Sequence, residues 1–126
     1  MGRLSKLETA ILEVLWTHGP LTVRKLLENF PRKDRPAYNT LLTIMGRMKG
    51  KGFVAVTGKA GSANVYRAAL SREAAQRRAM DDTIGLFAGQ ALPLMSHLID
   101  AGKLTLKDVE EAERRLRASL RKPGKP

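Results

Sequence analysis

The segment Arg35–Phe53 carries hydrogen-bonding side chains and cations at a spacing that suits recognition of a nucleic acid. Its apolar residues are Leu41, Ile44, Met45 and Met48, which follow one another at i, i+3, i+4 and i+7. This spacing predicts a helix with one apolar side, and it turns Asn39, Thr43 and Gly46 the other way. Short polar side chains reach base edges in a major groove, while flanking cations contact phosphates. An ordinary amphipathic helix with a solvated back is the alternative interpretation.

The predicted contacts with DNA divide into those to bases and those to the sugar–phosphate backbone. Asn39 can pair bidentately with adenine, and threonines can bond a base or a phosphate. The expected base contacts are Tyr38, Asn39, Thr40 and Thr43. For each of these, solvation or a phosphate contact remains the alternative, and Tyr38 could also simply pack. The expected backbone contacts, which fix register without reading sequence, are Thr22, Arg35, Arg47, Lys49, Lys51 and Lys59.

Glycines mark two further places where DNA could come close to the chain. Gly46 costs about 1 kcal/mol against alanine in a helix interior, so it either permits close approach to DNA or marks a place without room for a side chain. Lys59, between Gly58 and Gly61, predicts a hairpin tip at the phosphates; an ordinary surface turn is the alternative. Leu42, at the flank of the polar face, is a candidate for contact with a thymine methyl group.

Catalytic chemistry has little support in the sequence. Cysteine is absent, which excludes disulfides, thiolate metal sites and thiol catalysis. His18 lies in a helix-ending turn and His97 in an apolar stretch, and neither has a second ligand or an orienting carboxylate at a useful spacing. The acidic residues of Asp108–Glu113 are followed by arginines, which indicates surface pairing along a helix. We expect no enzymatic activity, no metal site and no cofactor.

The charge balance favours a polyanionic partner. The 126 residues include 23 Lys and Arg against 12 Asp and Glu, a net charge of +11. Residues 1–70 hold 12 basic and 4 acidic residues, and residues 71–126 hold 11 and 8, so the binding surface is expected in the first half. No apolar run approaches the roughly 18–20 residues of a membrane span, and no signal peptide is evident. We expect a cytoplasmic protein without a membrane partner.

Two helices are predicted before the Arg35–Phe53 segment. The capping box Ser5–Glu8 begins the first helix, which His18–Pro20 ends. Leu21 can form a very short strand. Thr22 is the expected N-cap of the second helix, which Pro31 ends.

The third helix and a β-hairpin are predicted to follow. Pro36 is expected near the first turn of this helix, which ends around residues 50–52. Strands at 53–57 and 64–67 are expected to flank a flexible connection of small residues at 58–63. Three helices followed by a hairpin predict a winged helix-turn-helix, a mostly α fold with a β-hairpin wing.

Three more helical segments are predicted to form a dimerisation region. One runs from Arg72 to about Gln90, a break follows at Pro93, and a capping box at Thr105–Asp108 begins the last. The expected dimer-interface residues are Ile84, Phe87, Leu92, Leu94, Met95, Leu98, Ile99, Val109 and Leu116. A second copy of the chain would cover them, and two symmetric reading helices imply a palindromic DNA site. The predicted domains are 1–70 and 71–121, with a disordered tail at 122–126.

Taken together, these motifs resemble the BlaI/MecI penicillinase-repressor family over nearly the whole chain. The matching segments are Leu4–Glu8, Val14–Trp16, Gly19–Val23, Ala37–Thr40, Lys51–Phe53 and Val65–Tyr66. The resemblance implies an N-terminal winged helix, a C-terminal helical dimerisation domain, and repression of bacterial promoters through palindromic operators. It also implies control of β-lactam-response genes, and with it antibiotic resistance, as the regulated process.

The chain departs from the family pattern at two features through which family members respond to inducing signals. Members that control β-lactam resistance are inactivated by cleavage at an Asn-Phe bond, triggered by a membrane sensor protease, whereas His97-Leu98 stands at the corresponding place here. This departure argues against cleavage at this bond, while a sensor protease as a possible partner and the inducing signal both stay open. The copper-responsive branch uses C-terminal cysteines, which this chain lacks.

A second class of function fits the same composition. A basic winged helix can serve as a scaffold that binds structured RNA or an acidic protein without operator specificity. The two classes differ in an observable way, because a repressor enriches a palindromic duplex from random DNA and a scaffold enriches none.

Overall fold

The computed structural model describes residues 3–121 and divides the chain into two compact units. We call Met1–Asp82 the N-terminal unit and Thr83–Pro126 the C-terminal unit. The division falls inside helix α4 (Arg72–Leu86), whereas the sequence places a domain boundary between residues 70 and 71. Ala75 of α4 is buried, which explains why the first part of this helix groups with the N-terminal unit. The predicted tail, 122–126, lies outside the described residues.

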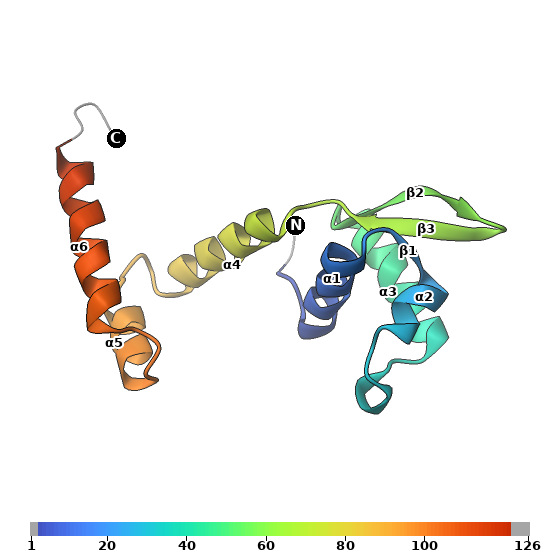
Figure 1. Cartoon of the computed structure of the whole chain (residues 1–126), viewed down its shortest axis with the longest axis horizontal. Helices are drawn as coiled ribbons and strands as arrows, with labels where there is room; N and C mark the ends of the chain where they lie inside the picture. The colour runs from blue at the N-terminus through green and yellow to red at the C-terminus, as the bar shows by residue number, and fades with distance from the viewer. Residues whose placement is uncertain (1–2, 122–126) are drawn as a thin grey trace. The chain divides into compact units, whose positions relative to one another are not determined.

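The N-terminal unit has the predicted order of helices and strands (Figure 1). Its elements before α4 are α1 (Lys6–His18), β1 (Leu21–Thr22), α2 (Val23–Glu28), the 3-10 turn η1 (Arg32–Asp34), α3 (Tyr38–Gly50), β2 (Val54–Ala60) and β3 (Ala63–Ala68). The strands form an antiparallel sheet in the order β1-β3-β2, and the β2–β3 hairpin is the wing. The expected winged helix-turn-helix is confirmed.

Helices α1 and α2 begin at the N-cap residues that the sequence predicts. The Ser5 hydroxyl accepts from the Glu8 N–H at 3.1 Å, and the Glu8 carboxylate accepts from the Ser5 N–H at 2.8 Å. Gly19 ends α1 at φ +81, a conformation that favours glycine. The Thr22 hydroxyl caps α2 by accepting from the Lys25 N–H at 3.2 Å. Satisfying free N–H groups in this way stabilises a helix by about 0.5–2 kcal/mol per cap.

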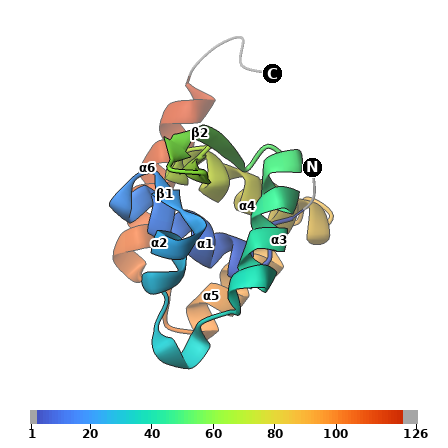
Figure 2. The same ribbon diagram turned by 90° about the vertical axis from the view of Figure 1, so that its right-hand side faces the viewer.

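One apolar core joins the helices to the sheet. The buried residues that form it are Ile11, Leu12, Leu15, Val23, Leu26, Phe30, Leu41, Met45, Met48, Phe53, Val54 and Tyr66. The predicted apolar side of α3 is therefore confirmed, with Ile44 partly buried at its edge. In Figure 2, α1 and α2 lie on one side of α3. Because the core holds one side of α3, the opposite side faces outward.

The start of α4 is attached to α1 by polar contacts. The Trp16 indole N–H donates to the Leu70 carbonyl at 2.9 Å, and the Arg72 guanidinium lies 5.0 Å from the centre of the Trp16 ring. Arg72 also forms hydrogen bonds of 2.7 and 2.5 Å with the two carboxylate oxygens of Glu13. These contacts fix the first turn of α4 on the N-terminal unit.

The hairpin boundaries differ from the prediction, whereas Pro36 lies near the first turn of α3 as expected. Pro36 directly precedes the N-cap Ala37, and Arg35 is extended because a residue that precedes proline is disfavoured in helical conformation. The hairpin strands are longer than predicted, so that only Gly61 and Ser62 form the turn. The small side chains of the connection do not interrupt backbone pairing, and an irregularity between Val56 and Gly58 absorbs a change of register.

The C-terminal unit contains the end of α4, then α5 (Leu92–Asp100) and α6 (Leu106–Leu120). Helix α4 ends at Leu86, earlier than predicted, and Gly89 follows at φ +77. Pro93 is not a break: it lies in the first turn of α5, where a missing N–H costs nothing. The predicted Thr105–Asp108 capping box of α6 is confirmed. Within residues 3–121, no helix is long and apolar enough to cross a membrane.

An ion pair ties the beginning of α1 to the end of α3. The buried Glu8 carboxylate accepts from the Lys51 ammonium at 3.2 Å as well as from Ser5. Burial by itself raises the pKa of Glu8, but the hydrogen bonds from Ser5 and Lys51 outweigh it and hold this pKa below its ordinary value. The stabilisation is therefore complete above the unfolded pKa of about 4.3 and is lost as the pH falls through the lower folded pKa.

We expect Glu8→Gln to lower the free energy of unfolding by about 1 kcal/mol at pH 7, because it removes the charged partner of Lys51. At about pH 3, below the unfolded pKa, part of this stabilisation is lost, so the difference between the two proteins should shrink. Urea unfolding followed by the fluorescence of Trp16, the single tryptophan, measures both values. Glu110→Gln on α6 is the control, and an equal effect of Glu8→Gln at both pH values contradicts the assignment.

Candidate nucleic-acid interface

The outward side of α3 forms an exposed polar ridge, which we define as Asn39, Thr40, Thr43 and Gly46. All four are exposed, and the buried side of the same helix holds them away from the core. Within residues 3–121, the Asn39 side-chain amide has no hydrogen-bond partner, so its donor and acceptor are both open to a ligand. The sequence prediction of an outward polar face therefore agrees with the structure, while the DNA contacts themselves stay a prediction.

Thr43 differs from its neighbours on the ridge because its hydroxyl is already engaged. Its Oγ1 donates to the Asn39 carbonyl at 3.0 Å, one helical turn earlier. The hydroxyl oxygen still carries lone pairs that can accept, and the methyl group is fixed in one orientation. Thr43 is thus arranged to accept a hydrogen bond or to contact an apolar group, and a donor role requires this internal bond to break.

The predicted backbone contacts divide into two groups in the structure. Arg47, Lys49 and Lys59 are exposed, and no carboxylate of the described residues lies within ion-pair distance of them. Lys51 instead pairs with Glu8. The first group keeps its charge available to phosphates, which makes these three cations the best-placed backbone contacts that the sequence identified.

Arg35 and Thr22 also have structural partners. The Arg35 guanidinium donates to the Phe30 carbonyl at 3.2 and 2.9 Å and to the Glu28 carbonyl at 3.2 Å, which holds the end of α2. The Thr22 hydroxyl serves as the α2 N-cap. Arg35 remains exposed and has further N–H donors, so a phosphate contact is compatible with these bonds.

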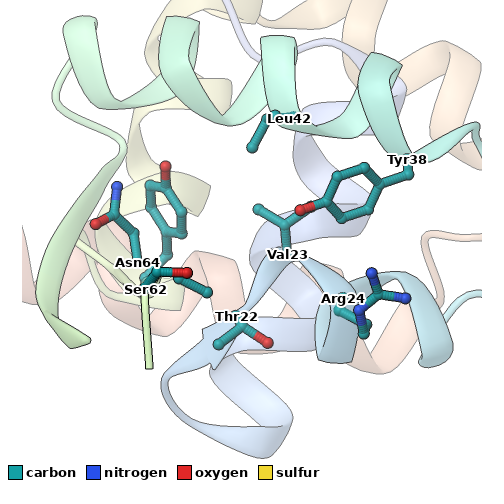
Figure 3. Close-up of a pocket in the computed structure, with 9 residues that line it drawn as sticks. Thr22, Val23, Arg24, Tyr38, Leu42, Ser62 and Asn64 are labelled. Carbon is teal, nitrogen blue, oxygen red and sulfur yellow. The ribbon is translucent and has the colours of Figure 1, made fainter. Parts of the chain in front are cut away.

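Between α3 and the wing lies a groove of about 430 Å³, shown in Figure 3. Its lining residues are Thr22, Val23, Arg24, Tyr38, Leu42, Ser62, Ala63, Asn64 and Tyr66. Tyr38 and Leu42 enter from α3, Thr22 and Arg24 from the start of α2, and Ser62 and Asn64 from the wing (Figure 3). Neither Arg24 nor Asn64 is identifiable as a site residue from the sequence, because only the fold brings these segments together.

The glycines of α3 and the wing are not required by packing within the chain. A Cβ atom added at Gly46 would meet no atom within 4 Å, and the same holds at Gly58. The interpretation that Gly46 lacks room for a side chain is therefore wrong. A helix-weakening residue on an exposed ridge, with open space around it, favours close approach of another molecule at this position.

The predicted dimer-interface residues are largely exposed in the single chain. Those with the larger exposed fractions are Ile84 (52%), Leu92 (72%), Met95 (38%), Ile99 (55%), Val109 (37%) and Leu116 (64%). Phe87, Leu94 and Leu98 are half-buried. No side chain of residues 83–121 is fully buried, so the helices of the C-terminal unit do not enclose a core of their own.

The two histidines are exposed and isolated. Residues 3–121 contain no group of three His, Cys, Asp or Glu side chains that could hold a metal ion. His97 lies within α5, and His18 is the last residue of α1. Within this described range the histidines thus form no candidate metal site, and the exposed ridge and its groove remain the candidate functional site.

Comparison with protein families gives a match that covers both units. The model of the penicillinase repressor family matches residues 4–118. The chain belongs to the penicillinase repressor family. The resemblance to BlaI/MecI proteins seen in the sequence is thereby confirmed, and the family is one of regulators and not of enzymes. Comparison with curated proteins gave no match.

Replacing Gly46 by alanine should change protein stability and DNA affinity in opposite directions. We expect Gly46→Ala to raise the free energy of unfolding by up to about 1 kcal/mol, because alanine is the better helix former and has room. The same variant should bind DNA more weakly, because the added methyl group stands on the ridge. Urea unfolding and fluorescence anisotropy with a labelled duplex measure the two effects.

The matched control for this prediction is Gly50→Ala. Gly50 is the last residue of the same helix, and a Cβ added there also meets nothing within 4 Å. It should leave DNA affinity unchanged. Close approach at Gly46 is refuted when Gly46→Ala is more stable and binds DNA as tightly as the wild type.

Proposed function

We propose that this protein is a homodimeric, sequence-specific transcriptional repressor that acts on a palindromic operator. The observation that carries the proposal is the exposed ridge of α3, whose polar groups face outward beside unpaired cations. Membership of the penicillinase repressor family supports the same conclusion. In this proposal α3 of each copy enters the major groove, and the bound dimer occludes a promoter.

Specific roles follow from the contacts that each side chain has left open. Asn39 pairs with a base through its free amide, while Thr40 and Thr43 complete the base contacts on the ridge. Arg47 and Lys49 at the end of α3, together with Lys59 on the wing, neutralise phosphates on either side. This arrangement separates sequence recognition on the ridge from electrostatic attraction at its margins.

Dimerisation is proposed from the apolar surface of the C-terminal unit. Its exposed leucine, isoleucine, methionine and valine side chains need cover, and a second copy supplies it with the commonest symmetry of soluble oligomers. A two-fold axis presents two α3 helices to one duplex, and the operator then has matching half-sites. We assign the domains accordingly: residues 1–70 bind DNA and residues 71–121 dimerise.

The regulated process is proposed from the family alone. Control of β-lactam-response genes in the cytoplasm of a bacterium is the function that the family name implies. The inducing signal is left open, because the bond between His97 and Leu98 lies inside α5, where a protease would have to unwind the helix before cutting. No cofactor takes part in this proposal.

Replacing Asn39 and Lys59 should weaken binding in two different ways. A duplex is first selected from random DNA by the purified wild-type protein. Asn39→Ala should then lose about 1–3 kcal/mol on the selected duplex and relax preference at one base pair, because it removes a base contact. Lys59→Ala should weaken selected and random duplexes alike and lower the dependence on salt.

Anisotropy titrations of both duplexes with both variants decide between these outcomes. Equal losses from Asn39→Ala on selected and random DNA would show that Asn39 does not read sequence. Failure of the wild type to enrich any duplex motif would refute the repressor proposal and favour the scaffold alternative.

Placing a charge on the exposed apolar side of α6 should prevent dimerisation. Leu116→Asp is expected to weaken self-association at least about tenfold, since pairing would bury an unpaired carboxylate. Lys107→Asp, which lies on the other side of the same helix, is the control. Sedimentation equilibrium measures the dimer constant, and unchanged association of Leu116→Asp argues against this interface.

A further inference from the structure

Arg24 places a positive charge in the groove between α3 and the wing, and no acidic group of the described residues neutralises it. Its guanidinium carbon lies 5.5 Å from the centre of the Tyr38 ring, the distance of a cation–π contact. No carboxylate of residues 3–121 lies within ion-pair distance of it. By contrast, the neighbouring Lys25 pairs with Glu28 at 4.0 Å. Arg24 is thus fixed in direction by an aromatic ring and left without a counter-ion.

The groove around Arg24 is lined by groups that suit an anion. None of its nine lining residues is acidic. Thr22, Ser62 and Asn64 bring hydroxyl and amide groups to its walls, as Figure 3 shows. Hydrogen-bond donors arranged around one unpaired guanidinium are the usual surroundings of a bound phosphate.

Tyr66, which also lines the groove, carries a further hydroxyl donor. Its side chain is only 5% exposed, and its hydroxyl makes no hydrogen bond with the described residues. Among those residues, however, no fully buried side-chain oxygen or nitrogen lacks a partner. The Tyr66 hydroxyl is therefore not sealed in the core, and Tyr66 is one of the residues that line the groove.

From these observations we propose that the groove holds one sugar–phosphate strand of duplex DNA, with the Arg24 guanidinium bound to a phosphate. In this arrangement, Tyr38 is a positioning residue and not a base contact, because the guanidinium covers a face of its ring. Leu42 forms the apolar wall against which a deoxyribose packs. The inference rests on the proposed function and adds to it a phosphate site and two residue roles.

The position of the groove explains why this site would contact the sugar–phosphate backbone and not a base. It lies beside the ridge of α3, between that helix and the wing. When a helix enters the major groove, the strands that border the groove pass along its two sides. A phosphate held by Arg24 would therefore fix how far α3 turns about its axis relative to the base edges.

The first test compares substitutions of Arg24 with a matched substitution of Lys25. Arg24→Met should weaken binding to selected and random duplexes by about tenfold and lower the salt slope by about 1, as loss of one phosphate contact requires. Lys25→Met, one residue along the same helix and outside the groove, should leave affinity within about twofold. Identical behaviour of the two variants overturns the proposal.

The second test addresses the role of Tyr38. Tyr38→Phe keeps the ring and should retain most of the affinity, whereas Tyr38→Ala should approach the loss of Arg24→Met. Because Tyr38 acts through Arg24, the double variant Arg24→Met/Tyr38→Ala should bind no more weakly than Arg24→Met alone. Additive losses in the double variant would assign Tyr38 an independent contact and overturn its positioning role. Circular dichroism confirms that each variant is folded.

The third test identifies the phosphate directly. Single phosphates of the selected duplex are replaced in turn by neutral methylphosphonates. At one position in each half-site, the methylphosphonate should weaken binding of the wild type but leave the affinity of Arg24→Met unchanged. An unchanged pattern of sensitive positions in Arg24→Met overturns the phosphate site while leaving the repressor function in place. A wild type that binds duplexes without enriching any motif refutes the repressor function, and the comparison on random DNA still decides the role of Arg24.

Discussion

The packing of Leu41, Met45 and Met48 against the core is the constraint on which the proposed interface depends. Consecutive residues of a helix are separated by about 100° of rotation, so three buried side chains on adjacent turns leave one orientation for the whole helix. Turning α3 by one residue in either direction would move Arg47 or Lys49 toward the core without a partner, which is costly. The outward direction of the ridge is therefore a consequence of what the opposite side buries.

The same core contacts determine which cations are free. Lys51 and Arg35 lie where they meet Glu8 and the end of α2, and both stabilise the fold. Among residues 3–121, Arg47, Lys49 and Lys59 pair with no carboxylate, and Arg24 contacts an aromatic ring instead of an acidic group. A basic sequence thus separates into charges that hold the winged helix together and charges that remain for a polyanion, although composition makes no such distinction.

Much of the fold could be predicted because its signals are local. Capping boxes at Ser5 and Thr105 and the apolar spacing of α3 depend on residues within a few positions of one another. The prediction of a helix break at Pro93 is wrong because proline is found both after the ends and in the first turns of helices. The predicted hairpin strands are too short because small residues can still pair their backbones. The groove could not be predicted: its walls come from three separate segments, and only the tertiary fold brings Arg24 to Tyr38 and Asn64.

The lack of a buried core in the C-terminal unit affects how fast the protein is degraded. Since none of its side chains in the described range is fully buried, little of its folding free energy comes from its own interior. In the dimer that we propose, folding and association form one equilibrium, and each copy stabilises the other by mass action. At low protein concentration, more of the chains would be monomeric, partly unfolded and accessible to proteases. At high concentration, dimerisation would protect them from degradation. The turnover of the protein would then depend on its own copy number.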